Sequence, residues 1–179
     1  MLPIGLDPSL PVAVAGRGLI AQARHARLAA AGLAPAFFTD APSPGDPPDA
    51  LARLPAANDL AGLRLLWVAG LPEALACSLA QAARAQRLLV NVEDVPGLCD
   101  FHSLAEVRRG DLVIAVSTGG RSPALASRLR ARLEAQFGPE WAGRLAWLGE
   151  RRRRWRARGL SGERLARISH AAIDAKGWL

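Results

Sequence analysis

The sequence predicts an α/β fold, in which a Rossmann-like domain with a parallel sheet (residues 1–118) precedes a helical tail (residues 119–179). Three observations support this prediction. Short apolar runs of strand length alternate with helix-forming segments over the first two thirds of the chain, as in a parallel sheet with helices on both faces. A glycine motif typical of nucleotide-binding proteins follows the first run. The last third holds helical segments without a further strand candidate.

The first strand is expected at residues 11–15 (PVAVA), a short apolar run that ends at Gly16. Residues 20–31 are rich in alanine, leucine and arginine, which favour a helix, and Gly32 ends it. Residues 34–39 form the second predicted strand. This order of strand, glycine turn, helix and strand is the beginning of a nucleotide-binding unit.

A loop follows, because four prolines between positions 42 and 48 exclude both a helix and an inner strand. Residues 63–69 (LRLLWVA) predict a third strand and residues 72–86 a helix with proline in its first turn. Residues 88–92 and 111–117 are two further strand candidates for the same sheet. The tail then contains three predicted helices, at residues 123–136, 140–158 and 163–176.

Length and charge limit the functional classes. A chain of 179 residues has room for one core and a short helical arm, which excludes a large multidomain enzyme. Residues 1–120 carry nine arginines and eleven acids, a net charge of −2, whereas residues 121–179 carry thirteen arginines and Lys176 against five acids, a net charge of +9. The basic tail indicates an anionic partner, which composition alone does not identify.

Several features are expected to be absent. No stretch approaches the roughly 18 apolar residues of a membrane span, and residues 1–4 lack the pattern of a signal peptide. The sequence therefore predicts a cytoplasmic protein without a membrane partner. Cys77 and Cys99 match neither a disulfide framework nor a metal-binding spacing, so no metal site is expected.

The glycine motif carries the clearest chemistry. Gly16-x-Gly18-x-x-Ala21 lies between a predicted strand and a predicted helix, where glycine permits a tight turn and a close approach of the backbone to a pyrophosphate. Asp40 follows the second strand, where a carboxylate can accept hydrogen bonds from a ribose diol and would repel a 2′-phosphate. The motif therefore predicts an NAD site. Arg17 has two interpretations, a salt bridge to the pyrophosphate or an exposed side chain.

Two other strand ends offer polar groups. Asp94 follows the strand at 88–92, at the sheet edge where ligands gather, and is either a catalytic carboxylate or a cap of the turn before Pro96. The loop Thr118-Gly119-Gly120-Arg121-Ser122 presents hydroxyls, backbone N–H groups and a positive charge that suit an anion. The alternative is an ordinary helix start, with Ser122 as N-cap and proline in the first turn.

Together these motifs resemble the precorrin-2 dehydrogenase/sirohydrochlorin ferrochelatase family, the N-terminal module of siroheme synthase. The resemblance covers about residues 1–150 and, more loosely, the tail. Its matching segments, in the family's order, are Leu2-Pro3-Ile4, Gly16-x-Gly18-x-x-Ala21-x-x-Arg24, Val90-Asn91-Val92-Glu93-Asp94, Phe101 and the run from Arg109 to Ala126. The last run is the most specific of them.

The resemblance implies NAD-dependent oxidation of precorrin-2 to sirohydrochlorin and, in bifunctional members, insertion of Fe²⁺ as a substrate to give siroheme. It implies that Asp94 is the catalytic aspartate, to which we assign the role of proton acceptor. It implies cofactor binding by Gly16, Gly18, Leu19, Ile20, Asp40 and Ala41. It implies that Thr118 belongs to an active-site loop, and we predict substrate binding by Thr118, Gly119, Gly120, Arg121 and Ser122. The helical tail is implied to form a homodimer.

One segment departs from the family pattern and leaves alternatives open. The polar segment that the family carries after its third strand is replaced here by Val68-Ala69-Gly70-Leu71-Pro72-Glu73, with Ala76 in place of an asparagine. This departure motivates an alternative, a chelatase without dehydrogenase activity and with a degenerate nucleotide site. A third hypothesis is a module that binds a tetrapyrrole or nucleic acid through the arginine-rich tail. Nucleic acid is disfavoured, because the arginines at 151–158 would lie on every face of a helix.

Overall fold

The computed structural model describes residues 5–179, so the Leu2-Pro3-Ile4 match lies outside the described residues. Contacts divide the chain into a first unit that ends at Ser103 and a second unit, Leu104–Leu179. The division falls earlier than the 118/119 boundary expected from the sequence. No helix within residues 5–179 is long and apolar enough to span a membrane.

The first unit is built on a four-stranded parallel sheet in the order β2-β1-β3-β4. Its strands are β1 (Val12–Gly16), β2 (Ala36–Phe38), β3 (Leu65–Ala69) and β4 (Leu89–Val92). Every residue of β1 and β3 is buried, because helices cover both faces of the sheet. The strands predicted at 11–15, 34–39, 63–69 and 88–92 are therefore confirmed.

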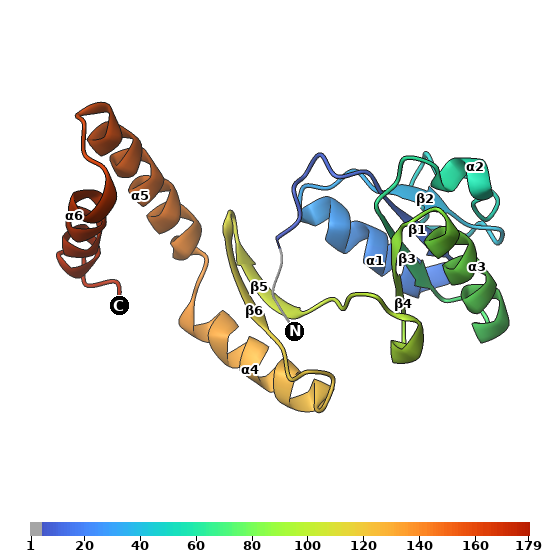
Figure 1. The fold of residues 1–179 in the computed structure, drawn as a ribbon. Coiled ribbons are helices and arrows are strands. Elements are labelled where there is room, and N and C mark those ends of the chain that lie inside the picture. Colours follow the sequence, from blue (N-terminus) through green and yellow to red (C-terminus); the bar gives the residue numbers. More distant parts are fainter. Residues whose placement is uncertain (1–4) are drawn as a thin grey trace. The chain divides into compact units, whose positions relative to one another are not determined.

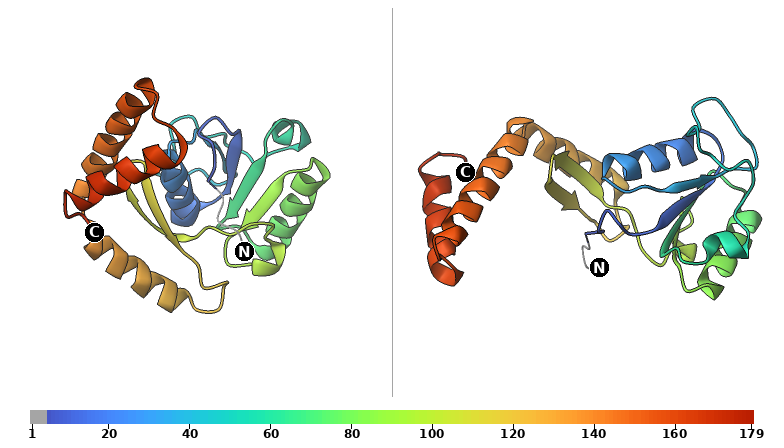
Figure 2. Two further views of the ribbon diagram at one scale, coloured as in Figure 1. Left: turned by 60° about the vertical axis from the view of Figure 1, so that its left-hand side comes forward. Right: turned by 90° about the horizontal axis from the view of Figure 1, so that it is seen from above.

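Two helices cover opposite faces of this sheet. Helix α1 (Gly18–Ala30) packs on the face formed by Val12, Val14 and Trp67, and α3 (Glu73–Ala85) packs on the face formed by Ala13, Ala15 and Leu66. Figures 1 and 2 show the two helices on either side of the sheet. Two short helices, α2 (Ala57–Leu60) and the 3₁₀ helix η1 (Pro96–Leu98), complete the unit. The strand order changes direction between β1 and β3, which is where ligands bind in open α/β sheets.

The second unit begins with an antiparallel hairpin of β5 (Ala105–Arg109) and β6 (Leu112–Val116). Helix α4 (Pro123–Gln136) packs on the hairpin, and α5 (Glu140–Ala157) pairs with α6 (Gly162–Asp174). The three helices predicted for the tail are confirmed.

The assignment of residues 111–117 to the parallel sheet is wrong. β6 pairs with β5, a strand that the sequence analysis missed, and belongs to the second unit. The physical reason is local: Gly110, with φ 58°, and Asp111 form a two-residue turn that connects the two strands antiparallel. Alternate residues of β6 are exposed, as expected for a hairpin with one face in solvent and unlike the inner strands of the first unit.

Candidate nucleotide-binding site

The turn between β1 and α1 requires glycine at position 16. Gly16 lies opposite Ala69 in the register of β1 and β3, and a Cβ atom at Gly16 would lie 1.9 Å from the backbone oxygen of Ala69. The next amide, of Arg17, donates a hydrogen bond to that same oxygen at 3.1 Å. The end of β3 therefore fixes the turn, and any side chain at position 16 would force the two strands apart.

The first turn of α1 is open to an anion. Gly18 begins the helix with φ 61°, and a Cβ atom added to it would meet nothing within 4 Å. Arg17 is the N-cap residue, but within the described chain its side chain does not cap the helix, and the first turn contains no acid. The first N–H groups of α1 thus lack side-chain acceptors, and the helix dipole favours a negative charge beside them. This cradle fits the pyrophosphate of a dinucleotide.

Asp40 stands just beyond β2, and its carboxylate is bound by Arg17. The Arg17 Nε atom donates to Oδ1 at 2.7 Å and Nη2 donates to Oδ2 at 2.7 Å. This hydrogen-bonded ion pair lowers the pKa of Asp40 and raises that of Arg17. About a third of each side chain remains exposed, so a ligand can reach the pair. The structure thus corrects one interpretation of Arg17, which binds Asp40 instead of pointing into solvent; a salt bridge from Arg17 to the pyrophosphate stays a prediction.

A shallow hollow of about 280 Å³ borders the start of α1. Leu19 and Ile20 are 81% and 51% exposed, which is high for large apolar side chains. Ala41 is exposed next to Asp40, and its amide donates to the Thr39 hydroxyl. The hollow is lined by Leu19, Ile20, Ala23, Arg24, Arg27 and Glu93. The hollow therefore extends from the first turns of α1 to Glu93, the residue that follows β4 and precedes Asp94.

Asp94 is exposed and adopts the left-handed conformation, with φ 60°. Its neighbours fix the turn that carries it. The Glu93 amide donates to the Val68 oxygen at 2.9 Å, and the Glu93 carboxylate forms an ion pair with Arg24, which also donates to the Ser103 hydroxyl at 2.8 Å. The sequence analysis missed this Arg24–Glu93 pair. The only sequence signal for it was a charged residue on the helix face that packs against the sheet.

The loop from Thr118 to Ser122 belongs to the second unit, whereas the other predicted site residues belong to the first. The Thr118 hydroxyl donates to the Ser122 oxygen and accepts from the Ser122 amide, and the Ser122 hydroxyl caps α4 by accepting from the Leu125 amide at 3.2 Å. Gly119 and Gly120 have φ values of 62° and 79°, and Arg121 is exposed. These contacts confirm the helix-start interpretation. They leave substrate binding by the loop a prediction.

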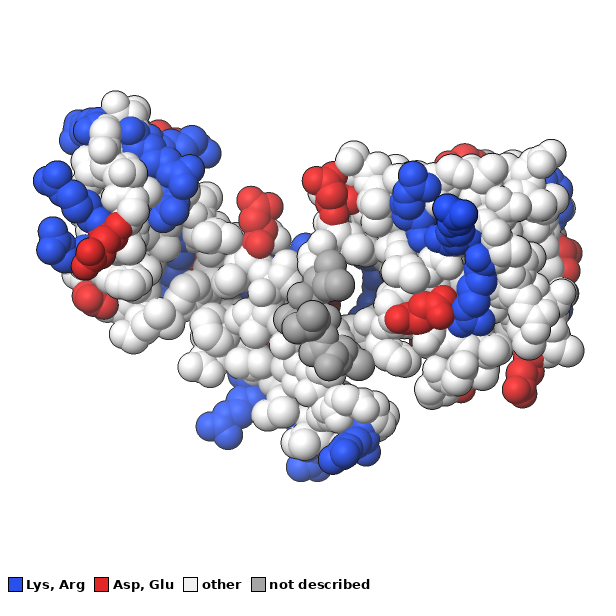
Figure 3. All heavy atoms as spheres, viewed as in Figure 1, with Lys and Arg blue, Asp and Glu red and all other residues white. Residues whose placement is uncertain are grey.

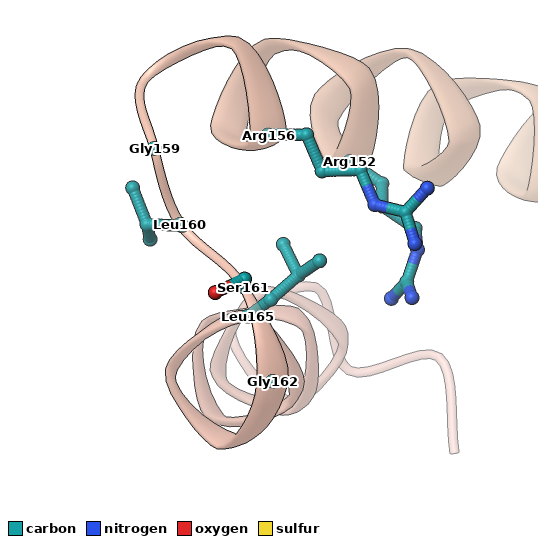
Figure 4. Close-up of a pocket in the computed structure, with 7 residues that line it drawn as sticks. All are labelled: Arg152, Arg156, Gly159, Leu160, Ser161, Gly162 and Leu165. Carbon is teal, nitrogen blue, oxygen red and sulfur yellow. The ribbon is translucent and has the colours of Figure 1, made fainter.

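Helix α5 carries the largest share of the basic excess of the tail, with six arginines against two glutamates (Figure 3). Arg144 stacks 4.8 Å from the ring centroid of Trp141, and Arg151 lies 4.8 Å from that of Trp147, so some arginines pack on aromatic rings. Arg152 and Arg156 extend beside a hollow of about 590 Å³ between α5 and α6 (Figure 4).

Within residues 5–179, no three His, Cys, Asp or Glu side chains gather as metal ligands would.

The parallel sheet, the glycine turn at its switch point and the open start of α1 define a dinucleotide-binding α/β protein. Comparisons with known proteins agree with this class. Residues 8–105 match the family described as "Putative NAD(P)-binding", and residues 109–136 match "Sirohaem biosynthesis protein central". The chain belongs to this NAD(P)-binding family, and its resemblance to the siroheme synthase module is confirmed.

Proteins similar to this chain include siroheme synthases of several bacteria. The chain is 45% identical to that of Methylococcus capsulatus over 92 residues and 42% identical to that of Ectopseudomonas mendocina over 96 residues. These matches cover 51% and 54% of this chain but only 19% and 21% of the relatives. The solved structure described as "SirC, precorrin-2 dehydrogenase" has a TM-score of 0.80 and 23% identity, with 100% of this chain and 92% of the other covered. That likeness confirms the fold.

Proposed function

We propose that this chain catalyses the NAD-dependent oxidation of precorrin-2 to sirohydrochlorin in siroheme biosynthesis. The observation that carries the proposal is one hollow lined both by Leu19 and Ile20, which directly follow the glycine turn, and by Glu93, the residue before Asp94. A nucleotide at the end of β1 and a carboxylate base at the end of β4, on the same edge of the parallel sheet, suit a dehydrogenase. The siroheme synthase relatives and the matched central segment support this substrate class.

The proposed reaction removes two electrons and two protons from the macrocycle. A bound nicotinamide would supply the hydride acceptor, and Asp94 accepts the accompanying proton from the macrocycle before releasing it to water. The backbone N–H groups at the start of α1 hold the pyrophosphate, and Gly18 leaves space for it. Leu19, Ile20 and Ala41 contribute cofactor contacts in this proposal. The loop Thr118-Gly119-Gly120-Arg121-Ser122 binds the substrate, whose many carboxylates suit Arg121.

The finer parts of the proposal concern cofactor choice and partners. The proposed cofactor is NAD, because the Asp40 carboxylate can accept hydrogen bonds from the ribose diol, although its ion pair with Arg17 weakens its repulsion of a 2′-phosphate. We further propose a cytoplasmic homodimer formed through the helical tail, with Fe²⁺ as a second substrate if chelation is retained. Light scattering of the purified chain tests the dimer.

Anaerobic incubation of the protein with precorrin-2 and NAD⁺ tests the proposed reaction. We expect sirohydrochlorin absorbance and NADH to increase together in equal amounts. A folded protein that forms neither product would contradict the proposal. Omission of NAD⁺ is the control, because spontaneous oxidation of the macrocycle would otherwise be counted as turnover.

A chelatase without dehydrogenase activity is the second candidate. It is motivated by the segment after β3, where Gly70 and its neighbours depart from the family pattern. Gly70 has φ 68°, and a Cβ atom there would lie 2.3 Å from the Arg17 oxygen, so this segment packs against the glycine turn. Insertion of Fe²⁺ into supplied sirohydrochlorin, with no detectable binding of NAD⁺, would favour the chelatase over the dehydrogenase.

A further inference from the structure

Arg17 occupies an unusual place for a cation, inside the glycine turn and on the carboxylate that is expected to select the nucleotide. Its backbone is fixed from two directions. The Arg17 amide donates to the Ala69 oxygen at 3.1 Å, and the Arg17 oxygen lies where a side chain at Gly70 would be. The side chain therefore starts from a fixed point and spans from the turn to Asp40, at the end of β2.

We propose that Arg17 sets the discrimination between NAD and NADP, because it holds Asp40 and places a guanidinium beside the position of the ribose 2′ group. This inference rests on the proposed function, since it requires a nicotinamide nucleotide in the site. It assigns Arg17 the role of a specificity-determining residue. A lone Asp40 would make the site strongly selective for NAD, whereas the pair makes it tolerant of both nucleotides.

The chemistry of the pair supports this role. Each carboxylate oxygen has two lone pairs, so Asp40 can accept from ribose hydroxyls while Arg17 donates one hydrogen bond to each oxygen. The pair uses two of the five N–H donors of the guanidinium, and the remaining donors can bind a 2′-phosphate. The positive charge also cancels most of the repulsion that the carboxylate would exert on that phosphate.

Exposure makes the pair accessible to either ligand. The side chains of Arg17 and Asp40 are 35% and 34% exposed, so neither charge is enclosed by the protein. A 2′-phosphate can therefore take over the guanidinium without opening the core, and a diol can bind the carboxylate without breaking the pair. An exchange of partners at the surface is less costly than the breaking of a buried pair.

Calorimetric titration with NAD⁺ and NADP⁺ tests the inference through the ratio of the two dissociation constants, Kd(NADP⁺)/Kd(NAD⁺). We expect a ratio below about 10 for the wild type, because the two charges nearly cancel. Arg17→Gln should raise the ratio by about 10- to 100-fold, the value of a charge-assisted hydrogen bond. Asp40→Asn should lower it, since the guanidinium is then free for the phosphate.

Arg84→Gln is the matched control. Arg84 also binds an aspartate, Asp100, through two nitrogens, but it lies on α3, on the opposite face of the sheet. Its loss should leave the ratio unchanged, and a shift like that of Arg17→Gln would overturn the inference. If Arg17→Gln does not fold, Asp40→Asn still tests the inference, because this change should lower the ratio of the two dissociation constants.

The outcomes separate this inference from the proposed function. An unchanged ratio in both Arg17→Gln and Asp40→Asn, with NAD⁺ still bound, would overturn the inference alone. If the folded wild type bound neither nucleotide, the proposed dehydrogenase function would fail, and the inference with it.

Discussion

Arg24 and Glu93 form an ion pair that connects helix α1 to the turn after β4. The Arg24 side chain is only 9% exposed, whereas that of Glu93 is 31% exposed. The guanidinium also donates to the Ser103 hydroxyl at 2.8 Å, near the end of the first unit. One buried cation therefore joins the helix of the glycine turn to the segment that carries Asp94.

Arg24→Met should destabilise the protein by about 1–3 kcal/mol, because the change leaves the half-buried Glu93 carboxylate without its charge-assisted hydrogen bond. The double variant Arg24→Met/Glu93→Val should recover most of this loss, since apolar residues of similar size often replace a buried pair without cost. Urea unfolding of both variants measures the difference. Equal stabilities of wild type and Arg24→Met would contradict the structural role of the pair.

Gly16→Ala should cost about 2 kcal/mol or more, because its Cβ atom would lie 1.9 Å from the Ala69 oxygen and the turn would have to shift. Gly143→Ala is the matched control. Gly143 lies inside α5, where an added Cβ atom meets nothing within 4 Å, so alanine should stabilise the protein by about 0.5–1 kcal/mol. Thermal unfolding of the two variants should thus shift in opposite directions. If both variants shifted in the same direction, the close approach between position 16 and the Ala69 oxygen would not be what determines the stability of Gly16→Ala.

The ion pair of Asp59 with Arg53 predicts that the stability of the protein depends on pH. Hydrogen bonds from the Arg53 guanidinium, and then from the Ala56 amide at 2.8 Å, lower the pKa of Asp59 from 3.8 to about 2. Between these values the unfolded chain binds more protons than the folded one, so the stabilisation is complete above about pH 4 and is lost as the pH falls toward about 2. Urea unfolding at several pH values should show a larger difference between wild type and Asp59→Asn at about pH 5 than at about pH 2. If the stabilities of wild type and Asp59→Asn changed in parallel with pH, the lowered pKa of Asp59 would be contradicted.

The parallel sheet could be predicted from the sequence because its strands are buried on both faces. Runs such as residues 11–15 are continuously apolar for that reason, and their burial is complete. The same criterion failed at residues 112–116, which are equally apolar in sequence but half exposed in a hairpin. Its partner, residues 105–109, contains charged residues and so gave no apolar run. The Gly110-Asp111 turn was the signal that could have indicated the hairpin.

The glycine turn and Asp40 could also be predicted, because the motif encodes local backbone geometry. The contacts of Arg17 and Arg24 could not. Each depends on how closely a turn or helix approaches another strand end, in one case 23 residues away and in the other 69. The spacing of residues in the sequence does not indicate that approach. An arginine next to a glycine motif gives the same sequence pattern whether its side chain contacts solvent, a phosphate or a carboxylate.

Asp94→Asn should lower the turnover of precorrin-2 by about 10²–10⁴-fold while the protein remains folded, because the amide cannot accept the proton. Asparagine is the informative change. Asp94 has φ 60°, and asparagine, unlike alanine, adopts this left-handed conformation readily. Asp94→Ala would add a backbone strain of about 1 kcal/mol to the loss of the carboxylate, which would confuse stability with chemistry.

Asp49→Asn removes an equal charge from another exposed aspartate of the first unit and serves as the control. We expect it to retain full turnover. Calorimetric titration should also give the same NAD⁺ affinity for Asp94→Asn as for the wild type, since Asp94 acts on the macrocycle in the proposed reaction. A loss of both turnover and NAD⁺ binding would instead indicate that Asp94 organises the nucleotide site, and full turnover would remove it from the proposed mechanism altogether.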